Sequence, residues 1–294
     1  MRRPLSTPKP AASPDVPTLP QRGGADMEGS VKLGSSGVVP ILQQMPQENR
    51  VFLSAEWRDL VMLNYEVDRT LLESYVPTGT VLDSFDGRTY ISLVAFQFRH
   101  TKLFGSLAIP FHADFDEVNL RFYVRRKEGS EDRRGVVFIA EIVPKWAVAK
   151  IARLAYGENY VCLPMQHSVD MSGATKTAKY EWQLNGTRCR LYARTLGAPA
   201  RPEEGSLEQF ITEHYWGYSA KRNGDSIEYH VSHVPWNVWA SSAAGFEGDA
   251  SGLYGLELAK VLGRRPDSAF IADGSPVIVS FGTRAKRSAA RSGS

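Results

Sequence analysis

The sequence has few cysteines, and it lacks long apolar runs and the glycine motifs of nucleotide-binding proteins. Cys162 and Cys189 are the only cysteines among 294 residues. Each stands alone in a strand-like segment, so we expect two reduced, buried thiols and neither a disulfide nor a metal ligand. No P-loop, dinucleotide fingerprint or serine-hydrolase elbow is present. We therefore expect no bound cofactor.

A membrane anchor is also missing from the sequence. No apolar stretch is long enough to span a bilayer, and prolines follow Arg2 and Arg3 where a signal peptide would be apolar. We therefore expect a cytoplasmic protein with no membrane partner.

The two ends differ in composition from the rest of the chain. Residues 1–46 hold eight of the 17 prolines and show no hydrophobic periodicity, and the last residues are small and basic. Such segments cannot bury enough apolar surface to fold. We therefore predict a disordered proline-rich leader (1–48), one folded domain (49–282) and a disordered basic tail (283–294).

The folded part has no excess of positive charge. The whole chain carries a formal charge of +3. Residues 51–282 contain 25 Lys and Arg against 28 Asp and Glu, and 25 − 28 leaves −3. A nucleic-acid-binding surface needs a basic patch, so we expect no nucleic-acid partner.

The pattern from Val51 onward is mostly that of strands. In EVNLRFYVRR (117–126), apolar and polar residues alternate, which is typical of a strand with one apolar face. Asp86-Gly87 and Asn185-Gly186 are tight-turn signals between such segments. Recurring hairpins predict a large antiparallel sheet or barrel.

Helices are few by the same criteria. Residues 67–77 and 146–156 have helical apolar spacing, and 206–216 opens with Ser206 and Gln209 at capping-box spacing. A late segment, 252–263, is a candidate fourth helix. We therefore predict an α+β, mostly antiparallel β domain with a few helices outside the sheet.

Glu141 and Lys145 are the first candidate site residues. If the chain stays extended through Pro144, positions 141, 143 and 145 share one face, so a carboxylate and an amine would meet on one wall. The alternative is that Glu141 pairs with an arginine on a neighbouring strand and Lys145 marks the exposed end of its strand.

A second candidate group is acidic. His112, Asp114, Asp116 and Glu117 are crowded before a strand, and such side chains can bind a metal ion. Acids in a loop are more often solvated, however, and no second histidine stands at helical spacing. We expect no metal.

A third group is aromatic. Tyr229, Val231 and His233 share one strand face, and two tryptophans follow, so His233 could line an apolar ligand pocket. Packing in the core is the alternative. From the polar face of the 117–126 strand, we add Arg121 and Tyr123 as ligand-binding candidates.

Several segments resemble known families. EWRDLVMLNYEVDRTLLESYVP, FDEVNL and EIVPK are similar to segments of acetoacetate decarboxylase and its relatives. FDGRTYISLVAF, DFDEVNLRFYVRR, GENYVCLPMQH and HYWGYS look closer still to the YqjF-like family within that superfamily. The first segment carries the residues at the matching places, which are Arg58, Asp59, Tyr65, Asp68, Leu72, Val76 and Pro77.

The resemblance implies a fold and a set of roles. The fold would be a barrel-like sheet wrapped by further strands. Lys145 would be the Schiff-base amine, Glu117 an active-site carboxylate and Arg58 the binder of a substrate carboxylate. The decarboxylases carry a second lysine next to the nucleophile, where this sequence has Trp146. This difference weighs against decarboxylation.

Two functions from different classes follow. The first is binding of a small organic, carboxylate-bearing molecule, with Arg58, Glu117 and the aromatic wall as its binding residues. The second is a lyase-type Schiff-base enzyme that acts on an oxo acid through Lys145. Homo-oligomers are implied by the resemblance alone.

Overall fold

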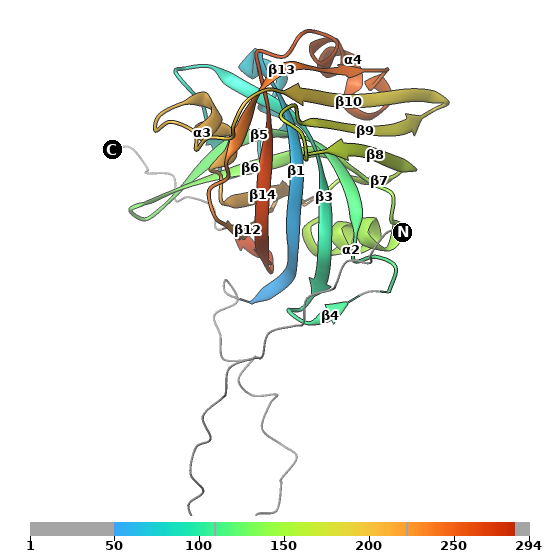
Figure 1. Cartoon of the computed structure of the whole chain (residues 1–294). Helices are drawn as coiled ribbons and strands as arrows, with labels where there is room; N and C mark the ends of the chain where they lie inside the picture. Colours follow the sequence, from blue (N-terminus) through green and yellow to red (C-terminus); the bar gives the residue numbers. More distant parts are fainter. Residues whose placement is uncertain (1–49, 109, 222, 286–294) are drawn as a thin grey trace, which may run out of the picture.

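The computed structural model describes residues 50–285, apart from 109 and 222, and it is dominated by strands (Figure 1). The strands of the first half are β1 (Val51–Val67), β2 (Val81–Leu82), β3 (Thr89–Leu103), β4 (Leu107–Ala108), β5 (Phe115–Glu128), β6 (Glu131–Val143) and β7 (Tyr160–Cys162). Those of the second half are β8 (Met165–Asp170), β9 (Thr177–Leu184), β10 (Thr187–Thr195), β11 (Trp216–Ala220), β12 (Ser226–His233), β13 (Val238–Glu247), β14 (Ser268–Ser280) and β15 (Thr283–Ala285).

The strands form one sheet with the order β15-β12-β11-β6-β5-β3-β1-β14-β13-β10-β9-β8. β2, β4 and β7 pair with β5, β3 and β6. Most pairings are antiparallel, and the parallel exceptions join β6 to β11 and to β7. The mostly antiparallel sheet predicted from the sequence is confirmed.

One extra pairing decides the shape of the sheet around the candidate site. β12 pairs with β14 as well as with β11, through Val231↔Val279 and its neighbours. The pairings therefore lead from β12 through β11, β6, β5, β3, β1 and β14 back to β12. We call this closed series of strands the circuit. Side chains on one face of these strands point into the space that the circuit encloses.

Helices are short and peripheral, as expected, but one prediction is wrong. Residues 67–77 form two 3-10 turns, η2 (Arg69–Leu71) and η3 (Glu73–Tyr75), in place of an α-helix. The observed α-helices are α2 (Trp146–Tyr156), α3 (Leu207–Thr212) and α4 (Ser251–Leu262). None of the helices in the described ranges is long and apolar enough to cross a membrane.

One half of the predicted capping box of α3 is present. The Ser206 hydroxyl accepts a hydrogen bond from the backbone N–H of Gln209, while the Gln209 side chain accepts one from Gly205, the residue before the cap, and not from Ser206. The first contact satisfies a donor that a helix start leaves without a partner. The cap fixes where α3 begins and so positions the residues that follow it.

The Asn-Gly turn is also as predicted. Asn185 and Gly186 adopt positive φ angles of 49° and 81° between β9 and β10. That geometry belongs to the tight turn whose twist matches the flanking strands. Asp86 and Gly87 turn in the same way between Phe85 and Arg88.

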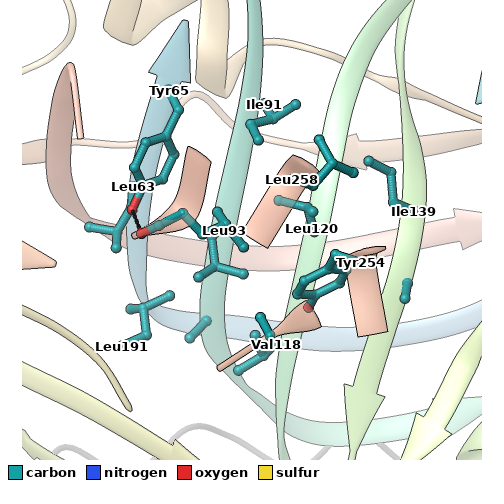
Figure 2. Close-up of a cluster of buried hydrophobic side chains, with 14 of the residues drawn as sticks. Leu63, Tyr65, Ile91, Leu93, Val118, Leu120, Ile139, Leu191, Tyr254 and Leu258 are labelled. Carbon is teal, nitrogen blue, oxygen red and sulfur yellow. Dashed lines mark hydrogen bonds between the residues drawn. The ribbon is translucent and has the colours of Figure 1, made fainter. Parts of the chain in front are cut away.

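The main hydrophobic core lies on the outer side of the circuit and joins β1, β3 and β5 to β9, β10 and α4. Figure 2 shows Leu63, Leu93 and Leu120 from these strands facing Tyr254 and Leu258 of α4. Leu63, Leu93 and Leu120 have no exposed surface. Since α4 closes this face, the second face of the same strands is left for the site.

Two further expectations need correction. Cys189 is buried and free as predicted, but the free Cys162 is exposed, because β7 is a short strand whose last side chain faces outward. β15 pairs with β12 at residues 283–285, which we assigned to the tail. The rest of the tail and the leader up to residue 49 lie outside the described residues.

Candidate ligand-binding site

A cavity of about 110 Å³ lies inside the strand circuit. Its wall is mostly apolar, with a smaller number of polar side chains. The lining residues that carry a polar side-chain atom are Trp57, Thr101, His112, Glu117, Arg121, Glu141, Tyr156, Glu158, Tyr160, Thr212, His214, Tyr229, His233 and Trp236. Cavities with apolar walls and a few convergent polar groups are the usual form of small-molecule sites.

Strand alternation brings two polar residues of β5 into this cavity. Glu117 and Arg121 line it, while Val118, Leu120 and Phe122 pack in the outer core. The alternating pattern of 117–126 is therefore confirmed, but its polar face points inward. The same pattern would fit a strand whose polar face is in water.

A β-bulge in β6 places a further acid on the wall. Leu120 pairs with Ala140 and Arg121 pairs with Phe138, so Ile139 is an extra residue in β6. A bulge shifts the alternation by one position. As a result Phe138 and Glu141, three residues apart, both face the cavity.

Three buried carboxyl groups meet at one end of the cavity. Glu117, Glu141 and Glu158 are 3%, 1% and 8% exposed. The Tyr229 hydroxyl donates to Glu158 Oε1 at 2.5 Å, and Tyr160 donates to Glu117 Oε2 at 3.4 Å. Glu141 lies within hydrogen-bonding reach of Glu158 and Tyr160. We call Glu117, Glu141 and Glu158 the acid cluster.

Burial governs the charge of the acid cluster. Desolvation, followed by smaller contributions from the neighbouring carboxyl groups, raises the pKa of Glu117 to about 8 and that of Glu141 well above its usual value. Desolvation also raises the pKa of Glu158 to about 7. The negative charge of one carboxylate disfavours ionisation of the neighbouring carboxyl groups. The acid cluster therefore keeps protons near neutral pH and can donate hydrogen bonds.

The cation of the cavity is Arg121, which is 8% exposed. One terminal nitrogen donates to the carbonyl oxygen of Ile211 at 3.3 Å, and the guanidinium lies 5.8 Å from the centre of the Tyr123 ring. Its Nε has no hydrogen-bond partner in the part of the chain that the structure describes. None of the ion pairs found between described residues includes Arg121.

A histidine that sequence reasoning missed lies beside Arg121. His214 follows α3 and lines the cavity, and its Nε2 is 3.3 Å from Asp83 Oδ2. Arg134 Nε donates to the same oxygen at 2.7 Å. These partners lower the pKa of Asp83 to about 2 against the effect of burial. Desolvation lowers the pKa of His214 to about 4.

Aromatic rings form another part of the wall. His233 stacks on Trp236 with ring centres 4.4 Å apart, and Trp57 lies 6.1 Å from Trp236. The Trp236 N–H donates to Ser275 at 3.0 Å, which holds the ring in place. The structure thus brings Tyr229, His233 and Trp236 together on the wall, where the strand pattern suggested a pocket.

Five of the predicted site residues line the cavity, namely Glu117, Glu141, Arg121, His112 and His233. Arg58 does not. It lies on the face of β1 opposite to Trp57, and its guanidinium pairs with Glu56 at 2.8 Å. The resemblance gave Arg58 a carboxylate-binding role, but alternation along β1 turns its side chain away.

Tyr123 and Lys145 also lie outside the cavity wall. Tyr123 is buried behind it, and its hydroxyl is 2.6 Å from Ser92 Oγ. β6 ends at Val143 and the chain bends at Pro144, so Lys145, although its backbone is extended, no longer belongs to the strand. Lys145 becomes the half-buried residue before α2, and its amine makes no hydrogen bond or ion pair with a described residue.

The acids around His112 are separated by the same alternation. Asp114 accepts a hydrogen bond from the backbone of His100, and Asp116 contacts His167 Nδ1 at 2.8 Å on the other face of β5. Only His112 and Glu117 reach the cavity. Within the described ranges, no group of three or more ligand side chains is arranged for a metal ion.

Five polar atoms of cavity-lining residues are buried without a hydrogen-bond partner among the described residues. They are Trp57 Nε1, Thr101 Oγ1, Arg121 Nε, Glu141 Oε2 and His214 Nδ1. Buried polar atoms nearly always bind protein, water or ligand groups, because each unmade hydrogen bond costs about 1–3 kcal/mol. Their convergence on one cavity marks it as the candidate site.

Comparison with known proteins agrees with this fold. Residues 54–276 match the family model DUF2071, described as an uncharacterized conserved protein. The uncharacterized protein YqjF of Bacillus subtilis (strain 168) is 26% identical over 202 residues, which are 67% of this chain and 80% of YqjF.

Solved structures extend the comparison. An acetoacetate decarboxylase-like enzyme from Sphingomonas wittichii RW1 has a TM-score of 0.57 at 15% identity, over 86% of this chain and all of that one. The enduracididine biosynthesis enzyme MppR, complexed with pyruvate, has a TM-score of 0.56 at 10% identity, over 81% and 92%. The chain thus belongs to the DUF2071 family and is a YqjF-like protein with the acetoacetate decarboxylase-like fold.

Proposed function

We propose that this protein binds a small organic carboxylate in the cavity, with Arg121 as the residue that holds the carboxylate group. The observation that carries the proposal is a buried guanidinium with an unpartnered Nε and no ion-pair partner among the described residues. Buried arginines are normally paired, because an unpaired charge in an apolar interior is costly. A carboxylate supplies both the charge and the hydrogen-bond acceptors.

The acid cluster supports the same reading. If its carboxyl groups were all ionised, they would neutralise Arg121 from a distance and repel an anion. Their raised pKa values keep part of the cluster protonated near neutral pH. The cavity then offers an anionic ligand one cation and several O–H donors.

The size of the cavity limits the ligand to a few carbons. A cavity of about 150 Å³ accommodates a benzene ring, and this one has about 110 Å³. The MppR structure, which shares the fold, contains pyruvate, a carboxylate of this size. We therefore expect ligands of about three to six carbons.

The test is calorimetric titration of the full chain with pyruvate, acetoacetate and butanoate at pH 7. Arg121→Gln should weaken binding about 10- to 100-fold, since a charge-assisted hydrogen bond contributes about 1.5–3 kcal/mol. Arg58→Gln is the matched control. Arg58 belongs to the same sheet but faces away from the cavity, so its loss should leave affinity unchanged.

Thermal unfolding of both variants checks that they are folded. Equal affinity of wild type and a folded Arg121→Gln protein for every acid would refute the proposal. So would the absence of binding to any acid in this size range.

Schiff-base chemistry on an oxo acid is the alternative from the sequence. It requires the Lys145 amine at the ligand, whereas Lys145 stands at the start of α2, outside the cavity wall. Borohydride reduction in the presence of oxo acids, read by intact-protein mass, tests this alternative. An adduct that disappears in Lys145→Ala would favour the enzyme over the binding protein.

A further inference from the structure

His214 has one ring nitrogen occupied and one free. Asp83 is held as a carboxylate by Arg134, whose Nε donates to it at 2.7 Å. A carboxylate only accepts hydrogen bonds, so the Nε2 of His214 carries the proton and donates to Asp83 Oδ2 at 3.3 Å. In a neutral imidazole the other nitrogen, Nδ1, is then an acceptor.

No described group of the protein donates a hydrogen bond to the acceptor Nδ1. This nitrogen is fully buried, and His214 is part of the cavity wall. The ring cannot turn away easily, because Tyr123 and Phe210 pack against it with ring centres 4.7 and 5.0 Å away. Asp83 fixes which nitrogen is presented.

His214 and Arg121 are close neighbours. Both contact the Tyr123 ring, and Arg121 bonds the carbonyl oxygen of Ile211, three residues before His214. The positive charge of Arg121 also acts on the His214 ring. A ligand whose carboxylate lies on Arg121 therefore has its adjacent carbon atoms near His214.

We propose that the ligand is a short hydroxy acid, whose carboxylate binds Arg121 and whose hydroxyl donates a hydrogen bond to Nδ1 of His214. This inference rests on the proposed function and narrows it from carboxylates in general to those with a donor close to the carboxylate. A site that hydrogen-bonds a ligand hydroxyl rejects analogues without one, because its buried polar atom is then left unpaired. Oxo acids lack that donor.

Calorimetric titration of the full chain with matched four-carbon acids is the test. The probes are butanoate, 2- and 3-hydroxybutanoate, and the two corresponding oxo acids. We expect one hydroxy acid to bind at least tenfold more tightly than butanoate and its own oxo analogue. In His214→Phe, which keeps a ring against Tyr123 and Phe210 but has no acceptor, this difference should disappear.

Nitrogen NMR of the labelled wild-type protein provides an independent measurement in case His214→Phe does not fold. It reads the tautomer of His214 directly, and we expect the proton on Nε2, which Asp83 Oδ2 accepts. The Nδ1 resonance should move when the hydroxy acid binds and stay in place when butanoate binds.

The outcomes distinguish the proposed carboxylate site from the role of His214. If acids bind, and Arg121→Gln loses them, but hydroxy acid and butanoate bind equally, the role of His214 is refuted while the carboxylate site stands. An unchanged preference in folded His214→Phe refutes it as well, and so does a wild-type His214 ring that carries its proton on Nδ1. If no acid binds at all, the proposed function fails and this inference fails with it.

Discussion

Two sets of buried carboxyl groups lie near the same cavity and have opposite charge states. Asp83 is 5% exposed and the acid cluster is 1–8% exposed, so burial is similar. Yet the pKa of Asp83 falls to about 2, while those of Glu117 and Glu158 rise to about 8 and 7. The neighbours differ. Asp83 contacts Arg134 and His214, whereas the glutamates contact one another and tyrosine hydroxyls.

The comparison shows that partners decide whether a buried acid is ionised. Burial disfavours the charge in both places, and only a cation and a good donor overcome it. The two sets can therefore interact differently with their surroundings. Asp83 stays ionised and orients His214, while the acid cluster keeps protons and can donate hydrogen bonds to a ligand.

The largest expected effect comes from removing Asp83. Asp83→Ala leaves His214 and Arg134 without their shared partner and should lower the free energy of unfolding by about 3 kcal/mol at pH 7. Urea denaturation measures it. Asp132→Ala is the control, because among the described residues the Asp132 side chain has only an exposed ion pair, with Arg125 at 3.8 Å, and its loss should cost less than about 1 kcal/mol. Equal losses would mean that the Asp83 contacts contribute little.

The ionisation of Asp83 should also be visible in acid. Its folded pKa is below the ordinary value of 3.8, so its stabilising contribution is complete above pH 4 and is lost as pH falls towards 2. The loss should be on the order of 2 kcal/mol. In Asp83→Asn this part of the pH dependence should be absent. If Asp83→Asn lost as much stability as wild type between pH 4 and pH 2, Asp83 would not be held ionised in the native protein.

The acid cluster should change the pH dependence of stability in the opposite direction. Its folded pKa values lie above 4.5, so the native state keeps protons that the unfolded chain releases, and stability falls between about pH 5 and 8. Glu141→Gln removes one of the coupled acids and should reduce this fall by about 1 kcal/mol or more. Unfolding measured at both pH values tests this, and a steeper fall in the variant would contradict it.

The smallest expected effect is that of Lys145. Lys145→Ala should change affinity for the acids less than twofold, because the side chain is not on the cavity wall. The same titrations used for Arg121→Gln measure it. A tenfold loss would show that the amine reaches the ligand when it is bound, and would revive Schiff-base chemistry.

Local patterns in the sequence predicted the sheet, its hairpins and part of the site. Alternation placed Glu117 and Arg121 on one face of β5, and spacing predicted α2 and the cap of α3. The pattern could not tell that the polar face was the inner one, because a cavity and bulk water select the same residues. Helical spacing at 67–77 likewise does not separate an α-helix from two 3-10 turns.

The site residues that sequence reasoning missed depend on long-range contacts. His214 lies 131 residues from Asp83, and Glu158 stands in the loop after α2, so no local period reveals either. The only signal for them was that both fall in segments that resemble the YqjF-like family, GENYVCLPMQH and HYWGYS. The resemblance was correct for the fold, and it gave a role to Arg58, whose side chain lies outside the cavity wall because its direction depends on which face of β1 turns inward.

The extra residue in β6 has a consequence for how this family can vary. Ile139 has no partner on β5, and Ala140 and Glu141 keep their pairing with Leu120 and Asn119 whether or not it is present. Loss of Ile139 together with the bulge would therefore leave Phe138 and Glu141 on the inner face. A one-residue insertion or deletion elsewhere in β6 would exchange inner and outer side chains. Relatives should therefore vary in length at position 139 more readily than in the rest of this strand.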